Sequence, residues 1–276
     1  MASKPPLSPR SKGLLGQATL GASDGGIRAR IFLVAVIAIA GLIAYLGIRP
    51  HQPWILWFTT LMIALSTDGA VRTHPRFHGA GAFATLPFLV LPAMAVAGAG
   101  YFIHEALEGY FRPGAGFFAG LFVAAIVLGE YYTVDFESRL YGTMRLILAV
   151  ATYLVAFAIY TIIYTEDFSL PVGATLVGLV SMGLSIALLR ETRILPGSAL
   201  LVGLAIGVTM AELRIVLYFF PLDGLLAGAL LIIGFYMATG IVHHLLDHDL
   251  EFGTLMEYVL VGGVGTAAVV ITRIVV

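Results

Sequence analysis

The chain has 276 residues, of which 59% are hydrophobic and only 11% carry a charged side chain. Soluble domains carry about 25% charged residues, so this composition excludes an ordinary soluble protein, and the apolar content excludes a disordered one. The net charge of −1 gives no support for nucleic-acid binding, and the absence of cysteine excludes disulfides, thiolate metal sites and cysteine nucleophiles. The class that fits is an all-α, polytopic transmembrane helical bundle.

The first 28 residues differ in composition from the rest of the chain. They are rich in Pro, Ser and Gly, carry scattered positive charge, and lack the apolar core and cleavage site of a secretory signal peptide. Such a segment cannot bury enough apolar surface to fold by itself. We expect residues 1–28 to form a disordered cytosolic N-terminal tail, followed by one transmembrane helical domain over residues 29–276.

Long uncharged runs, separated by short polar joints, fill the rest of the chain. A helix needs about 17–25 apolar residues to span a bilayer, and the shorter runs reach this length when one flanking polar residue is included. We therefore predict about nine spans, with eight as the alternative. Pro87 and Pro92 lie inside the third run and predict a kink there. The runs cover residues 31–48, 53–67, 79–103, 113–129, 146–165, 168–189, 194–211, 224–242 and 258–272.

The positively charged residues predict how the chain is threaded through the membrane. With nine spans and the N-terminus inside, eleven of the 15 Lys and Arg residues fall on the inner side and four on the outer side. Inner loops of membrane proteins carry an excess of positive charge, so we expect a multi-pass plasma-membrane protein with a cytosolic N-terminus. The outer residues are Arg49, Arg112, Arg214 and Arg273, and the inner residues are Lys4, Arg10, Lys12, Arg28, Arg30, Arg72, Arg76, Arg139, Arg145, Arg190 and Arg193.

The densest polar cluster lies between residues 243 and 251. On one continuous helix its polar residues would share a face, because they are spaced at i, i+3, i+4 and i+7; they are His244, Asp247, His248 and Glu251. Two imidazoles four residues apart, beside carboxylates, suit a divalent metal. A polar helix end at the membrane interface explains the same pattern, and we favour it. We therefore expect no metal and no cofactor, and keep His244 and His248 as metal-ligand candidates.

Two charges interrupt the seventh run, past its middle. Glu212 and Arg214 are two residues apart, so they point in different directions on a helix and need separate partners. An ionisable residue inside a membrane span is a candidate functional site. For Glu212 we weigh ion coupling against a buried structural contact, and favour the contact. The side chain of Arg214 is long enough to reach outward to the interface.

Three further carboxylates have structural explanations. Glu130 ends its span, where the helix dipole disfavours negative charge, so we expect it to pair with a cation of the same side, such as Arg139 or Arg145. Asp223 precedes a span and can cap it. Thr254 and the Glu three residues later have the spacing of a capping box for the last helix.

The C-terminal third carries a recognisable pattern. A Glu inside one span is followed by Pro and Gly before the next, and then by FYMATG, a polar loop and LMEYVLVG. Over residues 190–270 this pattern resembles a family of uncharacterised multi-pass membrane proteins, the domain of unknown function DUF5656. The segment DGAVRTHPRFHGAGAFATLP resembles the family more loosely. The resemblance implies a bacterial plasma-membrane protein and no known activity, so no catalytic or ligand residue is carried over.

Three classes of function fit these features. We favour a non-catalytic membrane component or accessory subunit, because a chain with few charges in its spans contains no obvious charged pathway. The second class is a small transporter or permease that uses Glu212 and Arg214. The third is a membrane-embedded enzyme that uses His244 and His248. The expected partners are membrane lipids and other membrane proteins, and no nucleic acid.

Overall fold

The computed structural model describes residues 29–77, 81, 84–166, 168–190, 196–247, 249 and 251–275. Within these residues the chain forms nine long helices and no strands, and each of the nine is long and apolar enough to span a membrane. The predicted all-α bundle and its nine spans are confirmed, while the predicted tail at residues 1–28 lies outside the described residues. The helices are the first helix (Ala29–Gly47), α2 (Pro53–Val71), α3 (Leu86–Ala106), α4 (Phe111–Tyr132), α5 (Tyr141–Thr165), α6 (Leu170–Leu189), α7 (Pro196–Tyr218), α8 (Gly224–Leu246) and α9 (Phe252–Val275).

Several helices extend beyond the apolar runs of the sequence. α5 starts at Tyr141 rather than at residue 146, and α9 starts at Phe252 rather than at residue 258. A polar side chain in a terminal turn can reach the membrane interface, so it does not end the helix. Thr254 consequently lies inside α9, and the predicted capping box is wrong. The predicted cap at Asp223 is confirmed, because its Oδ1 accepts the N–H of Leu226 at 3.0 Å.

The two prolines of the third run have different roles. α3 begins at Leu86, so Pro87 lies in its first turn, where a missing N–H leaves no acceptor unsatisfied. The prediction that Pro87 kinks the helix from within is therefore wrong. Pro92 does lie inside α3. The described residues that precede Leu86 in the sequence run, at positions 81, 84 and 85, are not part of the helix.

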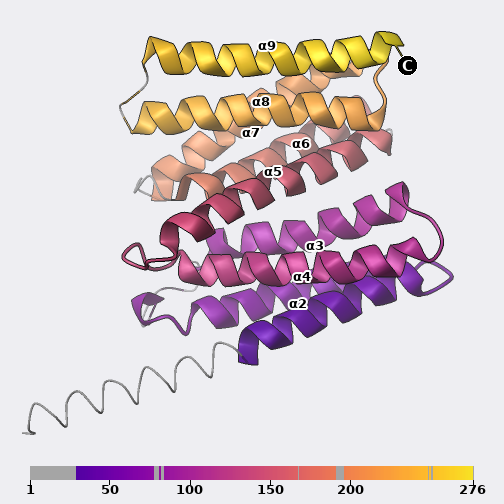
Figure 1. The fold of residues 1–276 in the computed structure, drawn as a ribbon, viewed down its shortest axis with the longest axis vertical. Coiled ribbons are helices and arrows are strands. Elements are labelled where there is room, and N and C mark those ends of the chain that lie inside the picture. Colours follow the sequence, from indigo (N-terminus) through magenta and orange to yellow (C-terminus); the bar gives the residue numbers. More distant parts are fainter. Residues whose placement is uncertain are drawn as a thin grey trace, which may run out of the picture.

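The nine helices lie side by side in one bundle (Figure 1). α3 packs against α2, α4, α5 and α6, which makes it the central helix of the N-terminal part. The core is a continuous apolar cluster that includes Leu56, Leu91 and Phe235, all fully buried. α9 lies at one edge of the bundle in Figure 1 and packs against α8, so most of its surface faces outward.

Helices α6 and α7 approach each other closely. A Cβ atom on Gly207 would lie 2.7 Å from the carbonyl oxygen of Gly178, and a Cβ on Gly178 would lie 3.0 Å from the carbonyl oxygen of Gly207. The two helix backbones are therefore in contact, which only glycine permits. Small residues at helix interfaces allow this kind of packing in membranes, where burial against lipid supplies little driving force.

The polar joints predicted to share one side of the membrane do lie together. Arg76, after α2, pairs with Asp135, after α4, at 3.1 Å, and Arg190, after α6, donates to the Thr133 hydroxyl at 3.2 Å. We call this end of the bundle the arginine end; its described arginines include Arg72, Arg76, Arg139, Arg145 and Arg190. The cytosolic assignment of the arginine end stays a prediction.

Candidate functional site

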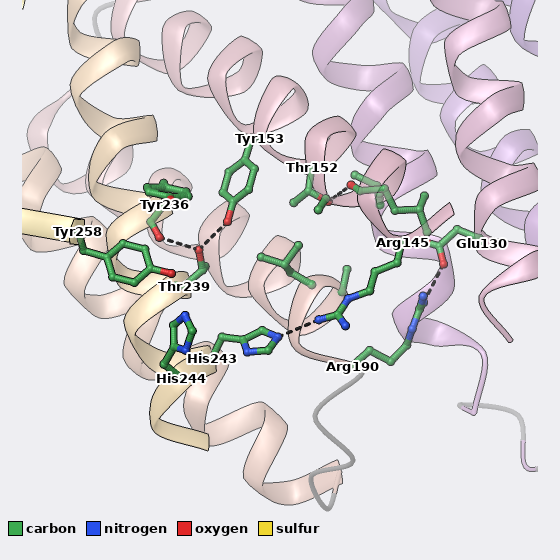
Figure 2. A pocket seen from close by; sticks show the side chains of 16 residues that line it. Glu130, Arg145, Thr152, Tyr153, Arg190, Tyr236, Thr239, His243, His244 and Tyr258 are labelled. Atoms are coloured by element: carbon green, nitrogen blue, oxygen red, sulfur yellow. Dashed lines mark hydrogen bonds and ion pairs between the residues drawn. The ribbon is translucent and has the colours of Figure 1, made fainter. Parts of the chain in front are cut away.

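A pocket of about 260 Å³ lies at the arginine end of the bundle. Figure 2 shows polar side chains from α4, α5, α6, α8 and α9 converging on it. The charged side chains lie at the helix ends, and the side chains one to three turns further along the helices are aromatic or apolar. The lining consists of Leu91, Glu130, Arg145, Leu148, Ala149, Thr152, Tyr153, Ala187, Leu188, Arg190, Tyr236, Thr239, Gly240, His243, His244 and Tyr258.

An ion pair between Glu130 and Arg190 forms one wall of the pocket. Oε2 of Glu130 lies 2.8 Å from Nη1 of Arg190, and the glutamate side chain is only 2% exposed. The same guanidinium donates to the Thr133 hydroxyl and lies 3.8 Å from the centre of the Phe88 ring. These contacts fix the position of Arg190 before any ligand binds.

Arg190, which is not among the cations predicted for this role, forms the ion pair with Glu130. It belongs to the same end of the bundle, and Arg145, which was named for this role, lines the same pocket. Arg139, also named, is exposed on the surface. The ends of α4 and α6 meet through long-range packing, which the order of residues along the chain does not reveal.

A second polar chain runs from Arg145 through His243 to Asp247. A guanidinium can only donate hydrogen bonds, so the Nε2 atom of His243 accepts one from Nη2 of Arg145 at 2.9 Å. The proton of the neutral imidazole is then on Nδ1, which lies 3.0 Å from Oδ2 of Asp247. Asp247 and Arg145 together fix the tautomer and the orientation of the His243 ring. Figure 2 shows the contact between His243 and Arg145.

His244 contacts Asp249 at 2.9 Å through its Nδ1 atom, and its ring lines the pocket. The continuous helix that would place residues 244, 247, 248 and 251 on one face is not formed, because α8 ends at Leu246 and α9 begins at Phe252. His248 lies outside the described residues. In the part of the chain that the structure describes, no three His, Asp or Glu side chains gather as metal ligands would.

The interior of the pocket is aromatic and weakly polar. The Tyr153 hydroxyl and the Thr239 hydroxyl lie 3.1 Å apart, and Thr239 also donates to backbone carbonyls of α8. The rings of Tyr236 and Tyr258 contact each other above the histidines. Because Tyr153 is eight residues beyond Arg145 on α5, the pocket extends on the order of 12 Å into the bundle. It therefore suits a ligand with a charged head and a less polar body.

Glu212 and Arg214 lie away from this pocket, near the other end of α7. Glu212 is exposed on the surface of the bundle, so the buried contact favoured for it is not formed within the described residues. Arg214 is 2% exposed, and its guanidinium lies 4.3 Å from the centre of the Tyr164 ring. The expectation that Arg214 reaches outward is wrong, because Gly173 of α6 leaves room for the guanidinium inside the bundle.

Sequence reasoning missed most of the aromatic pocket residues. A signal was present, since Tyr236, Gly240 and His243 follow the i, i+4, i+7 spacing of one helix face. In the sequence, Arg145 is mainly one of the positive charges that predict the orientation of the chain in the membrane. The sequence does not show that this face of α8 packs against the polar first turns of α5, because that contact depends on the tertiary structure.

Taken together, the fold and the pocket define a multi-pass membrane protein with a pocket lined by two arginines at one end of its helices. The chain belongs to a family of uncharacterised proteins, described as protein of unknown function (DUF5656), whose sequence profile matches residues 28–272. The resemblance noted over residues 190–270 thus extends over almost the whole transmembrane domain. No curated protein and no solved structure matches the chain.

Proposed function

We propose that this protein is a non-catalytic membrane component that binds the anionic head of a membrane amphiphile in the pocket at the arginine end. The observation that carries the proposal is a pair of guanidinium groups in one pocket: Arg145 and Arg190 both line it, beside the Glu130 carboxylate. Guanidinium groups are well suited to phosphate and carboxylate ligands because they donate parallel hydrogen bonds.

The shape of the pocket supports an amphiphile rather than a free anion. The charges lie at the helix ends, at the level of lipid headgroups, and the lining continues inward through Leu148 to Tyr153 and Tyr236. A lipid phosphate or carboxylate at Arg145 would extend its apolar body along this interior. We infer that the pocket faces the cytosolic leaflet of a bacterial plasma membrane, because the inner side carries the positive excess.

The arrangement of His243 supports a binding role over a catalytic one. A general base needs a free ring nitrogen directed at the proton that it removes. Both nitrogens of His243 are engaged, one with Arg145 and one with Asp247. In this position the imidazole acts as a spacer that orients the Arg145 guanidinium.

The proposal is tested by ligand-induced stabilisation of the purified protein in a neutral detergent. The probes are phosphatidylglycerol, phosphatidylcholine and inorganic phosphate, and the readout is the midpoint of thermal unfolding. Phosphatidylglycerol should raise the midpoint saturably, phosphatidylcholine should not, and inorganic phosphate should act only at much higher concentration. Equal effects of the two lipids would contradict the proposal, and equal effects of phosphatidylglycerol and phosphate would identify a free anion as the ligand.

The site is assigned by a pair of matched substitutions. Arg145→Gln should lower the affinity for phosphatidylglycerol at least about tenfold, since a charge-assisted hydrogen bond contributes roughly 1.5–3 kcal/mol. Arg139→Gln removes the same charge from the same end of the bundle but does not touch the pocket. This control should bind like the wild type. Wild-type affinity in Arg145→Gln would place the lipid elsewhere.

One observation favours an enzyme as the second candidate. Nδ1 of His244 contacts the Asp249 carboxylate at 2.9 Å while the ring lines the pocket, an arrangement that can orient the other nitrogen as a general base. An enzyme of this kind would lose turnover of its lipid in His244→Gln but still bind it. The transporter alternative has less support, because neither Glu212 nor Arg214 lines the pocket.

A further inference from the structure

At the opposite end of the bundle, Arg214 is a buried cation that forms no ion pair with any residue the structure describes. Its side chain is 2% exposed, and its Nε and Nη1 atoms have no hydrogen-bond partner among the described residues. Moving a guanidinium out of water costs several kcal/mol, so buried charges in proteins are paired. The structure therefore requires a negative charge that the described residues do not supply.

Aromatic contacts meet only part of this requirement. The guanidinium carbon lies 4.3 Å from the centre of the Tyr164 ring and 5.6 Å from that of Tyr218. A cation–π contact with the ring face is favourable, but it leaves the N–H groups at the edge of the guanidinium without acceptors. The two rings hold Arg214 in place and leave its donors available.

The start of α6 adds further donors at the same place. A Cβ atom on Gly173, in the first turn of α6, would lie 3.4 Å from Nη2 of Arg214, so the guanidinium rests against this turn. The N-cap residue Ser169 makes no side-chain cap bond, which leaves the N–H groups of Leu170 and Val172 without intrahelical acceptors. The positive end of the α6 dipole and the unpaired guanidinium thus meet at one point.

We propose that Arg214 and the first turn of α6 bind a small inorganic anion of halide size. The site offers N–H donors and positive charge, which select an anion. Arg214 is almost fully buried and packed between Tyr164 and α6, so the anion must be small and weakly hydrated, as chloride is. The bound anion neutralises the guanidinium and links α6 to α7 at the end of the bundle opposite the lipid pocket.

The test is the thermal unfolding of the full chain in neutral detergent, with sodium chloride compared with sodium gluconate at equal ionic strength. Chloride should raise the unfolding midpoint by a few degrees in a saturable way, because a ligand that binds only the folded state stabilises it. Bromide should act in the same way. The absence of any difference between chloride and gluconate would overturn the proposal.

Four variants assign the effect. Arg214→Met should abolish the chloride response. The methyl group of Gly173→Ala would lie in van der Waals contact with Nη2 of Arg214 and cover this donor, so it should raise the half-saturating chloride concentration several-fold; this variant keeps the test open if Arg214→Met does not fold. Arg112→Gln is the control, because Arg112 lies at the same end and already donates to the carbonyls of His104 and Leu107. An unchanged response in both Arg214→Met and Gly173→Ala would refute the site. So would a response seen only after Asp167→Asn, which would identify the chain's own carboxylate as the counter-ion.

Discussion

Glu130 at the end of α4 and Arg190 just after α6 meet at 2.8 Å with both side chains largely withdrawn from solvent. The pair joins two helices that are not neighbours in sequence and forms the wall of the pocket that we assign to an anionic amphiphile. A buried ion pair of this kind gives little net stability, but the loss of one partner leaves the other charge uncompensated.

Glu130→Gln should therefore lower the free energy of unfolding by about 3 kcal/mol, because it leaves the Arg190 guanidinium without the carboxylate that it pairs with. The matched control is Asp135→Asn, which breaks the pair with Arg76 at the same end of the bundle. Both partners of that pair are more than 40% exposed, so the loss should be at most about 1 kcal/mol. The free energy of unfolding is measured in mixed detergent micelles. Equal losses in the two variants would show that Glu130 is solvated.

Gly207→Ala should separate α6 from α7. The added methyl group would lie 2.7 Å from the carbonyl oxygen of Gly178, so we expect a loss of about 1–3 kcal/mol from overpacking. Gly197→Ala, on the same helix, adds its methyl group to open space and should be neutral or slightly stabilising. The free energy of unfolding in the same micelles is compared between the two variants. An unchanged free energy of unfolding in Gly207→Ala would refute the close backbone contact.

The fold was largely predictable from the sequence, because the membrane imposes the length and apolarity of each span. All nine spans and the shared side of the polar joints followed from these constraints. Helix ends were less predictable: α9 begins at Phe252, before the apolar run that starts at residue 258, because Thr254 and Glu257 continue the helix instead of ending it. The candidate site was predicted least, since the contact of Arg145 with His243 depends on which faces of α5 and α8 meet.

The orientation in the membrane can be read with single cysteines, because the chain has none of its own. Glu137→Cys lies in the joint between α4 and α5, and Glu108→Cys lies in the joint between α3 and α4; both positions are exposed. In intact cells a membrane-impermeant maleimide should label residue 108 and not residue 137. Membrane disruption should expose both. Labelling of residue 137 alone in intact cells would invert the predicted topology.

In the proposed function His243 orients Arg145, and conservative replacement tests this role. Gln offers an acceptor oxygen in place of the imidazole nitrogen, so His243→Gln should keep the affinity for phosphatidylglycerol within about threefold. His243→Leu leaves the guanidinium without that acceptor, and the affinity should fall about tenfold. Lipid titrations measure the affinity of both variants for phosphatidylglycerol. Equal losses would show that the ring acts through its bulk and not through Nε2.

The most direct test of the lipid pocket is native mass spectrometry of the protein as it leaves the membrane. The wild type and Arg139→Gln should each carry one tightly held anionic amphiphile, and Arg145→Gln should carry none under the same conditions. Retention of the same anionic lipid by Arg145→Gln, or co-purification of zwitterionic lipid alone with the wild type, would contradict the account.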